Sequence, residues 1–150
     1  MKMSTKGRYG LRALIDLAQY SEIEPVSITS IAARQGISER YLEQLMSKLK
    51  KAELIKSIRG AGGGYTLARS IESITVGEVL RALEGNIEPV ECSGIQETGC
   101  DSSSCCVSKM VWQKINDSVN QAVDGIMLVD LVNESKKMLE NNNIEHIKCQ

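Results

Sequence analysis

The first half of the chain carries apolar residues at the spacing of amphipathic helices. The first set repeats at i, i+3, i+4 and i+7 and consists of Leu11, Leu14, Ile15 and Ala18. This spacing predicts a helix at about residues 6–20. A second, short helix is expected after Ser27, whose hydroxyl would cap its first turn.

A third helix is expected from Ser38 to about Ala52. Gly36 can adopt the left-handed conformation that ends one helix, and the hydroxyl of Ser38 can cap the next. The apolar face of this third helix consists of Leu42, Leu45 and Leu49. Two helices joined by a glycine-containing turn form a helix-turn-helix, whose second helix enters the major groove of DNA.

A glycine-rich hairpin is expected directly after the third helix. Residues 54–58 alternate as a strand does, residues 59–64 form a turn with four glycines, and residues 65–68 return. The turn lacks the Lys-Ser/Thr of a phosphate-binding P-loop, which argues against nucleotide binding. The expected fold is therefore mainly α, a winged helix-turn-helix with a small β-hairpin as its wing.

The second half of the chain predicts three further helices and a loop. Thr75 and Glu78 have the spacing of a capping box at the start of one helix. A long helix is expected at residues 107–124, where the apolar positions are Val107, Val111, Ile115, Val119 and Ala122. A last helix is expected at residues 128–140. We divide the chain into a DNA-binding domain (1–84), a cysteine loop (85–106), a helical region (107–140) and a flexible tail (141–150).

Charge is distributed unevenly along the chain, although the net charge is only −1. The first 70 residues carry 12 Lys/Arg and 6 Asp/Glu, whereas the other 80 carry 6 and 13. A basic first half indicates a polyanionic partner, double-stranded DNA above all. The sequence contains no run of about 18 apolar residues and no recognisable export signal. We therefore expect a cytoplasmic protein without a membrane partner.

The polar face of the third helix carries side chains that can read base edges. Gln44 can pair with adenine, Glu43 can accept from cytosine, and Arg40 and Lys48 can bind guanine or phosphate. Arg8, at the start of the first helix, can contact phosphate, and Arg59 can enter a minor groove beside the wing. The residues expected to contact DNA are Arg8, Ser38, Arg40, Tyr41, Glu43, Gln44, Lys48, Arg59 and Gly60.

Four of the five cysteines fall within fifteen residues: Cys92, Cys100, Cys105 and Cys106. In a chain without an export signal, such a cluster indicates metal ligands or redox thiols rather than disulfides. Structural zinc sites usually place cysteines two to four apart, whereas iron–sulfur clusters accept wider spacing. Spacing alone leaves an iron–sulfur cluster, zinc and redox thiols open. An enzyme is not expected, because the chain has no Ser/His/Asp set and a single histidine.

The sequence resembles the IscR-type iron–sulfur transcription regulators over nearly its whole length. The resemblance rests on residues 4–9 with 13–14 in the first helix, residues 38–45 in the third helix, and residues 58–65 in the hairpin. It also rests on Cys92, Cys100 and Cys106, followed by Trp112. The combination is specific, although each segment alone is not.

This resemblance implies a homodimer, built on the long helix, that reads a near-palindromic operator, mostly as a repressor. It assigns Cys92, Cys100 and Cys106 as ligands of one iron–sulfur cluster per subunit, with 2Fe–2S favoured and 4Fe–4S possible. The cluster would sense cluster supply, redox state or nitric oxide. A winged-helix repressor that senses through a thiol–disulfide pair or a partner protein, without a cluster, is the alternative.

The sequence departs from the family pattern at the fourth ligand. Seven residues separate the first two ligand cysteines, where the best-known members have five, and Lys109 stands where IscR-type members have a histidine. Other members use a carboxylate in the first helix, at a position that here is Arg8. His146 lies far along the polar tail. The fourth ligand stays open, with Cys105, Asp101, Glu97 and Ser108 as candidates.

Overall fold

The computed structural model describes the fold of residues 2–90 and 106–142. The helices, in chain order, are α1 Thr5–Tyr20, α2 Ile28–Gln35, α3 Glu39–Lys51, α4 Val76–Glu84, α5 Lys109–Asp124 and α6 Leu128–Asn142. The strands are β1 Ile55–Ile58 and β2 Gly64–Leu67, and a short 3-10 helix, η1, covers Ile71–Ser73. The prediction of a mainly helical fold with one small hairpin is confirmed.

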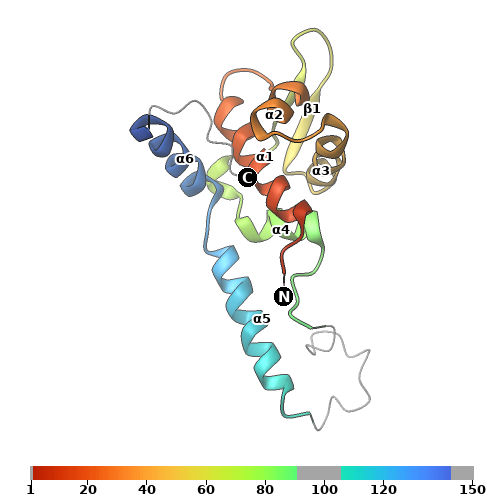
Figure 1. The fold of residues 1–150 in the computed structure, drawn as a ribbon, viewed down its shortest axis with the longest axis vertical. Helices are drawn as coiled ribbons and strands as arrows, with labels where there is room; N and C mark the ends of the chain where they lie inside the picture. Colours follow the sequence, from red (N-terminus) through yellow and green to blue (C-terminus); the bar gives the residue numbers. More distant parts are fainter. Residues whose placement is uncertain (1, 91–105, 143–150) are drawn as a thin grey trace.

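Helix α1 lies at the centre of the main body. It packs against α2, α3, α4, α6 and β2, and Figure 1 shows these elements gathered around it. Leu14 and Leu17 of α1, Leu45 of α3 and Leu83 of α4 are almost completely buried in one core. The apolar positions that predicted the first and third helices therefore hold the helix-turn-helix together.

Side-chain caps fix the starts of the helices that the sequence predicted. The hydroxyl of Ser27 accepts from the amide of Ser30 at 3.2 Å. The hydroxyl of Ser38 accepts from the amide of Tyr41, also at 3.2 Å. Thr75 and Glu78 form the predicted capping box. Gly36 has a φ of +66°, so the expected left-handed turn between α2 and α3 is confirmed.

The wing consists of β1 and β2, which pair antiparallel from Ile55 opposite Leu67 to Ile58 opposite Gly64. A third segment joins them, because Val26 and Tyr65 exchange backbone hydrogen bonds of 2.9 and 2.8 Å. A Cβ at Gly64 would overlap the carbonyl of Val26, so this close approach requires glycine. The return strand begins at Gly64, one residue before its predicted start.

Helix α5 extends away from the main body, at the opposite end of the molecule from the wing (Figure 1). It begins at Lys109, two residues later than predicted, because residues 107–108 form a turn. Its C-terminal half packs on α4, where Gly77 lets the helices approach and Arg81 binds the carboxylate of Asp124. Its first turns leave Met110 and Val111 70% and 52% exposed.

Among the described residues, no helix is both long and apolar enough to cross a bilayer. The predicted long helix and last helix are confirmed as elements, with α6 ending at Asn142 rather than at about 140. The predicted cysteine loop and tail lie largely outside the described residues.

Candidate nucleic-acid interface and cysteine loop

Helix α3 separates its residues into a buried face and an exposed face. Leu42, Leu45 and Leu49 are at most 1% exposed, whereas Arg40, Glu43 and Gln44 face solvent. The buried leucines fix the rotation of the helix about its own axis. The three polar side chains are therefore presented together, as a helix that enters the major groove requires.

Tyr41 connects the start of α3 to α1 rather than pointing freely outward. Its hydroxyl donates to the Thr5 hydroxyl oxygen at 3.2 Å. Its ring meets that of Tyr9 edge to face at 6.2 Å, and the Arg12 guanidinium stacks on Tyr9 at 5.4 Å. Helix α1 therefore contacts the first turn of α3 through Tyr41 and holds it in place. A DNA contact by Tyr41 stays a prediction.

Two of the three lysines in the last turns of α3, Lys48 and Lys50, donate hydrogen bonds within the protein. The ammonium of Lys48 donates to the backbone carbonyl of Leu83 at 3.0 Å, at the C-terminal end of α4. The ammonium of Lys50 donates to the hydroxyl of Ser57 in β1 at 2.8 Å, which ties the wing to α3. The sequence could not foresee either contact, and the predicted phosphate contact by Lys48 would compete with its bond to α4.

The remaining predicted DNA contacts are exposed. Arg8 lies on the first turn of α1, and Arg59 and Gly60 lie in the turn of the wing. Gly60 has a φ of +108°, which favours glycine there. Ser38 is exposed as well, and its hydroxyl is used as the α3 cap. Thus α3, the start of α1 and the wing all present candidate contacts.

A buried ion pair that the sequence analysis did not identify holds α1 against α2. Asp16, whose side chain is 3% exposed, accepts from Arg34 at 2.7, 2.9 and 3.1 Å and from the Gln35 side-chain amide at 2.9 Å. The Arg34 guanidinium also stacks on Tyr20 at 4.2 Å. The sequence feature that could have revealed this pair is the position of Asp16 between Leu14 and Leu17, where a carboxylate interrupts the apolar face of the helix. This pair orients the first helix of the helix-turn-helix.

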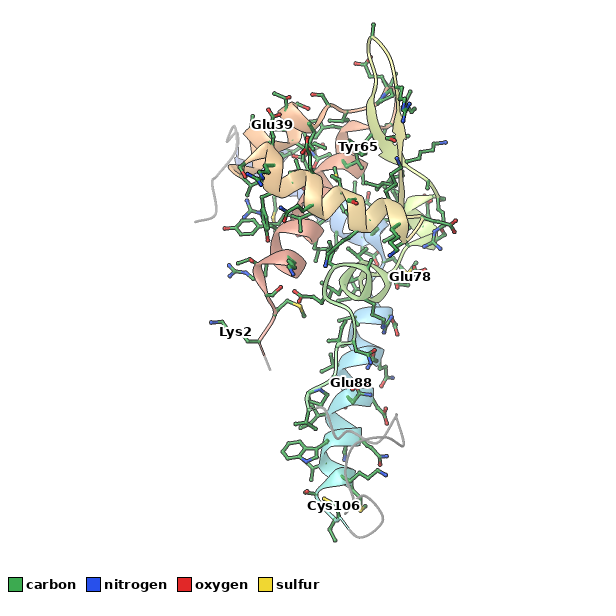
Figure 2. All side chains as sticks on the ribbon, turned by 90° about the vertical axis from the view of Figure 1, so that its right-hand side faces the viewer. Lys2, Glu39, Tyr65, Glu78, Glu88 and Cys106 are labelled. Atoms are coloured by element: carbon green, nitrogen blue, oxygen red, sulfur yellow. The ribbon has the colours of Figure 1, made fainter. Side chains whose placement is uncertain are left out.

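Cys106 is the one predicted metal ligand that falls within the described residues. It lies at the far tip of α5, as labelled in Figure 2, and is partly exposed. Its sulfur is 3.1 Å from the Ser108 hydroxyl. That hydrogen bond, with the backbone amide of Lys109, holds the pKa of the Cys106 thiol below its usual value. A favoured thiolate is what a metal ligand or redox thiol requires.

The other residues assigned to the metal site lie outside the described residues. They are Cys92 and Cys100, together with the candidate fourth ligands Cys105, Asp101 and Glu97. Of the candidate fourth ligands, only Ser108 is described, next to the Cys106 sulfur. Lys109 follows it as the first residue of α5.

Comparisons with known proteins identify a family. Residues 3–134 match the Rrf2 family, described as iron-dependent transcriptional regulators. The HTH-type transcriptional regulator IscR of Aliivibrio salmonicida is 38% identical over 147 residues, which cover 97% of this chain and 86% of that relative. These relatives are transcriptional regulators rather than enzymes.

Two solved structures share the fold with a TM-score of 0.73 and 43% sequence identity each. CymR, the global cysteine regulator of B. subtilis, is matched over 89% of this chain and 98% of that chain. The IscR of T. potens is matched over 92% and 90%. The predicted resemblance and winged-helix fold are therefore confirmed, and the chain belongs to the Rrf2 family of transcriptional regulators.

Proposed function

We propose that this protein is a sequence-specific transcription regulator, mostly a repressor, whose DNA binding responds to an iron–sulfur cluster on Cys92, Cys100 and Cys106. The observation that carries the proposal is the state of Cys106. Its partly exposed thiol, 3.1 Å from the Ser108 hydroxyl and with its pKa lowered beside Ser108 and Lys109, lies three residues before α5, the helix that projects from the main body. Thiolates are the usual protein ligands of such clusters.

The donor chemistry of the described part of the loop fits such a cluster. When bound, the cluster would supply a centre that is assembled, oxidised or lost according to iron and redox conditions. The chain's own contribution is to stabilise the Cys106 thiolate by the hydrogen bond from Ser108 and by the amide at the start of α5. Whether the cluster is 2Fe–2S, as we favour, or 4Fe–4S, each subunit would hold one.

A homodimer built on α5 would supply the second DNA-binding helix that a twofold operator requires. Val107, Met110 and Val111 are between 52% and 79% exposed on the projecting end of this helix. Burying them against a second copy would remove apolar surface from water. A twofold dimer presents two copies of α3, and a near-palindromic operator with half-sites about one helical turn apart matches that arrangement.

The test is anaerobic purification followed by iron, sulfide and visible-absorption measurements. We expect a coloured protein with equal iron and sulfide, two of each per chain for 2Fe–2S. Cys106→Ser should lose the colour, whereas the matched control Cys149→Ser, outside the assigned ligands, should keep it. A colourless wild-type protein with one zinc per chain, or with no metal after reconstitution, would contradict the proposal.

A thiol switch without a cluster is the second candidate. The same lowered pKa of Cys106 favours attack on an oxidant or a disulfide. CymR, described as a cysteine regulator, and T. potens IscR have the same TM-score and the same sequence identity to this chain. This candidate predicts a colourless protein that gains a disulfide, seen by mass spectrometry of the intact chain, and changes its DNA affinity reversibly with oxidant and dithiothreitol.

A further inference from the structure

The C-terminal end of α4 is the point where the DNA-binding elements meet the start of the cysteine-bearing segment. Leu83 and Glu84 are the last residues of α4, and Gly85 follows with a φ of +83° as the chain turns away. Both Leu83 and Glu84 bind another helix. Glu84 binds the start of α1 and the Leu83 carbonyl binds α3, and these two helices carry most of the candidate DNA contacts.

Glu84 caps the start of α1 from outside that helix. A single carboxylate oxygen accepts from the Ser4 amide at 3.0 Å, the Ser4 hydroxyl at 2.6 Å and the Gly7 amide at 2.8 Å. Such amides of a first helical turn have no partner within their own helix. Partial burial favours the neutral carboxyl, but these hydrogen bonds prevail and hold the pKa of Glu84 below its usual value. A Cβ at Gly7 would overlap this carboxylate.

Lys48 makes the second connection. Its ammonium donates to the Leu83 carbonyl at 3.0 Å, one of the carbonyls that a helix leaves unpaired at its C-terminal end. That end carries a partial negative charge, which favours a cation. Because Lys48 is a residue of α3 and Leu83 is a residue of α4, this hydrogen bond fixes α3 relative to α4. The Lys48 ammonium therefore lies at the C-terminal end of α4, where the chain leaves the helix at Gly85.

We propose that Glu84 and Lys48 are positioning residues for DNA binding, which hold α1 and α3 in register on the C-terminal end of α4. The inference rests on one part of the proposed function, namely that α3 and the start of α1 bind DNA. Cys106 lies at the opposite end of the molecule from the wing (Figure 2). Along the chain, the cysteine-bearing segment is joined to α4 at Gly85, next to both contacts.

The proposal replaces the phosphate contact expected of Lys48, and the two roles differ in salt dependence. A lysine that binds phosphate contributes about one unit to the slope of log K against log salt and acts equally on every duplex. A positioning lysine affects the placement of Gln44 and its neighbours, so it acts on the preferred duplex and leaves the slope unchanged.

The experiment measures binding by fluorescence anisotropy at several salt concentrations. The probes are a duplex selected by the full-length wild-type protein from a random pool and a scrambled duplex. The variants are Lys48→Met, Lys48→Arg, Glu84→Ala, Glu84→Gln and the double variant Lys48→Met/Glu84→Ala. Lys51→Met removes the same charge from the same helix and serves as the matched control. Circular dichroism confirms that each variant is folded.

We expect Lys48→Met and Glu84→Ala each to weaken the selected duplex by about tenfold and the scrambled duplex hardly at all. Lys48→Arg and Glu84→Gln should retain most of the affinity, because the first keeps a donor and the second keeps an acceptor. The double variant should lose less than the product of the two single losses, because both contacts act on one end of α4.

Two results would overturn the inference. One is a slope that falls by about one unit in Lys48→Met, more than in Lys51→Met, with equal losses on both duplexes. The other is a Glu84→Gln variant as weak as Glu84→Ala, which would indicate that charge alone matters. A wild-type protein that enriches no sequence refutes the proposed function instead, and the slope on the scrambled duplex still decides the role of Lys48.

Discussion

The ion pair between Asp16 and Arg34 allows a stability prediction whose size follows from its burial. The Asp16 side chain is 3% exposed and accepts three hydrogen bonds from Arg34 and one from Gln35. Substituting Asp16→Ala leaves both donors without their acceptor. Removing one partner of a buried pair costs about 3–5 kcal/mol. Because the Arg34 side chain is 19% exposed, water can rehydrate part of its charge, and we expect about 3 kcal/mol.

The assays are urea and thermal unfolding followed by circular dichroism. They use one fixed protein concentration, because the stability of the proposed dimer would depend on concentration. For a chain of this size, 3 kcal/mol corresponds to a fall in Tm of roughly 6–12 °C. Arg34→Met should cost at least as much, because it strands the more deeply buried charge. The double variant Asp16→Ala/Arg34→Met should lose clearly less than the sum. Additive losses, or a loss below about 1 kcal/mol for Asp16→Ala, would show that the pair does not stabilise the packing of α1 on α2.

Three further predictions concern other parts of the molecule. Gln44→Ala should weaken a selected operator by about 1–3 kcal/mol and relax the preference at one base pair, as binding to single-base variants of that operator would reveal. Gly77→Ala should lower the Tm, because its Cβ would overlap the Asp124 carboxylate and displace the ion pair with Arg81; an unchanged Tm would show that these side chains move aside without cost. The lowered pKa of Glu84 means that its contribution to stability is present at neutral pH and disappears as pH falls through that pKa. Wild type should therefore lose more stability than Glu84→Gln on acidification, and parallel pH profiles would contradict this.

Local patterns predicted most of the fold. The spacing of Leu42, Leu45 and Leu49 fixed the buried face of α3, and the Ser38 hydroxyl marked its start, because both signals involve residues within a few positions of one another. The 3-10 helix at Ile71–Ser73 was not predicted, because so short an element has no periodicity to detect. The boundaries of β1 and β2 differed from prediction by one residue, and those of α5 and α6 by two.

Contacts between distant residues could not be predicted in this way. The pairing of Val26 with Tyr65 depends on how the helix-turn-helix brings the segment before α2 to the wing. Lys48 has the sequence context of an exposed lysine on a reading helix, yet its partner is a backbone carbonyl 35 positions away. Glu84 likewise contacts Ser4 across 80 positions. A backbone acceptor or a helix amide leaves no side-chain signature for sequence reasoning to find.

The candidate site was predicted unevenly for the same reason. The exposed positions of Arg40, Glu43 and Gln44 follow from helix periodicity and agree with the structure. The assignment of Cys92, Cys100 and Cys106 rests on resemblance and on the chemistry of the described Cys106, because the other two cysteines lie outside the described residues. The roles of all these residues in binding stay predictions.

If a cluster on the cysteine loop controls DNA binding, as proposed, then removing the cluster must change the affinity for DNA. The affinity of anaerobically purified protein for a selected operator is measured before and after the cluster is removed by a chelator, with iron and sulfide determined on the same samples. We predict a change in affinity of at least about tenfold, in parallel with the loss of iron and absent in Cys106→Ser. An affinity that stays the same while the iron is lost would show that the cluster does not control DNA binding.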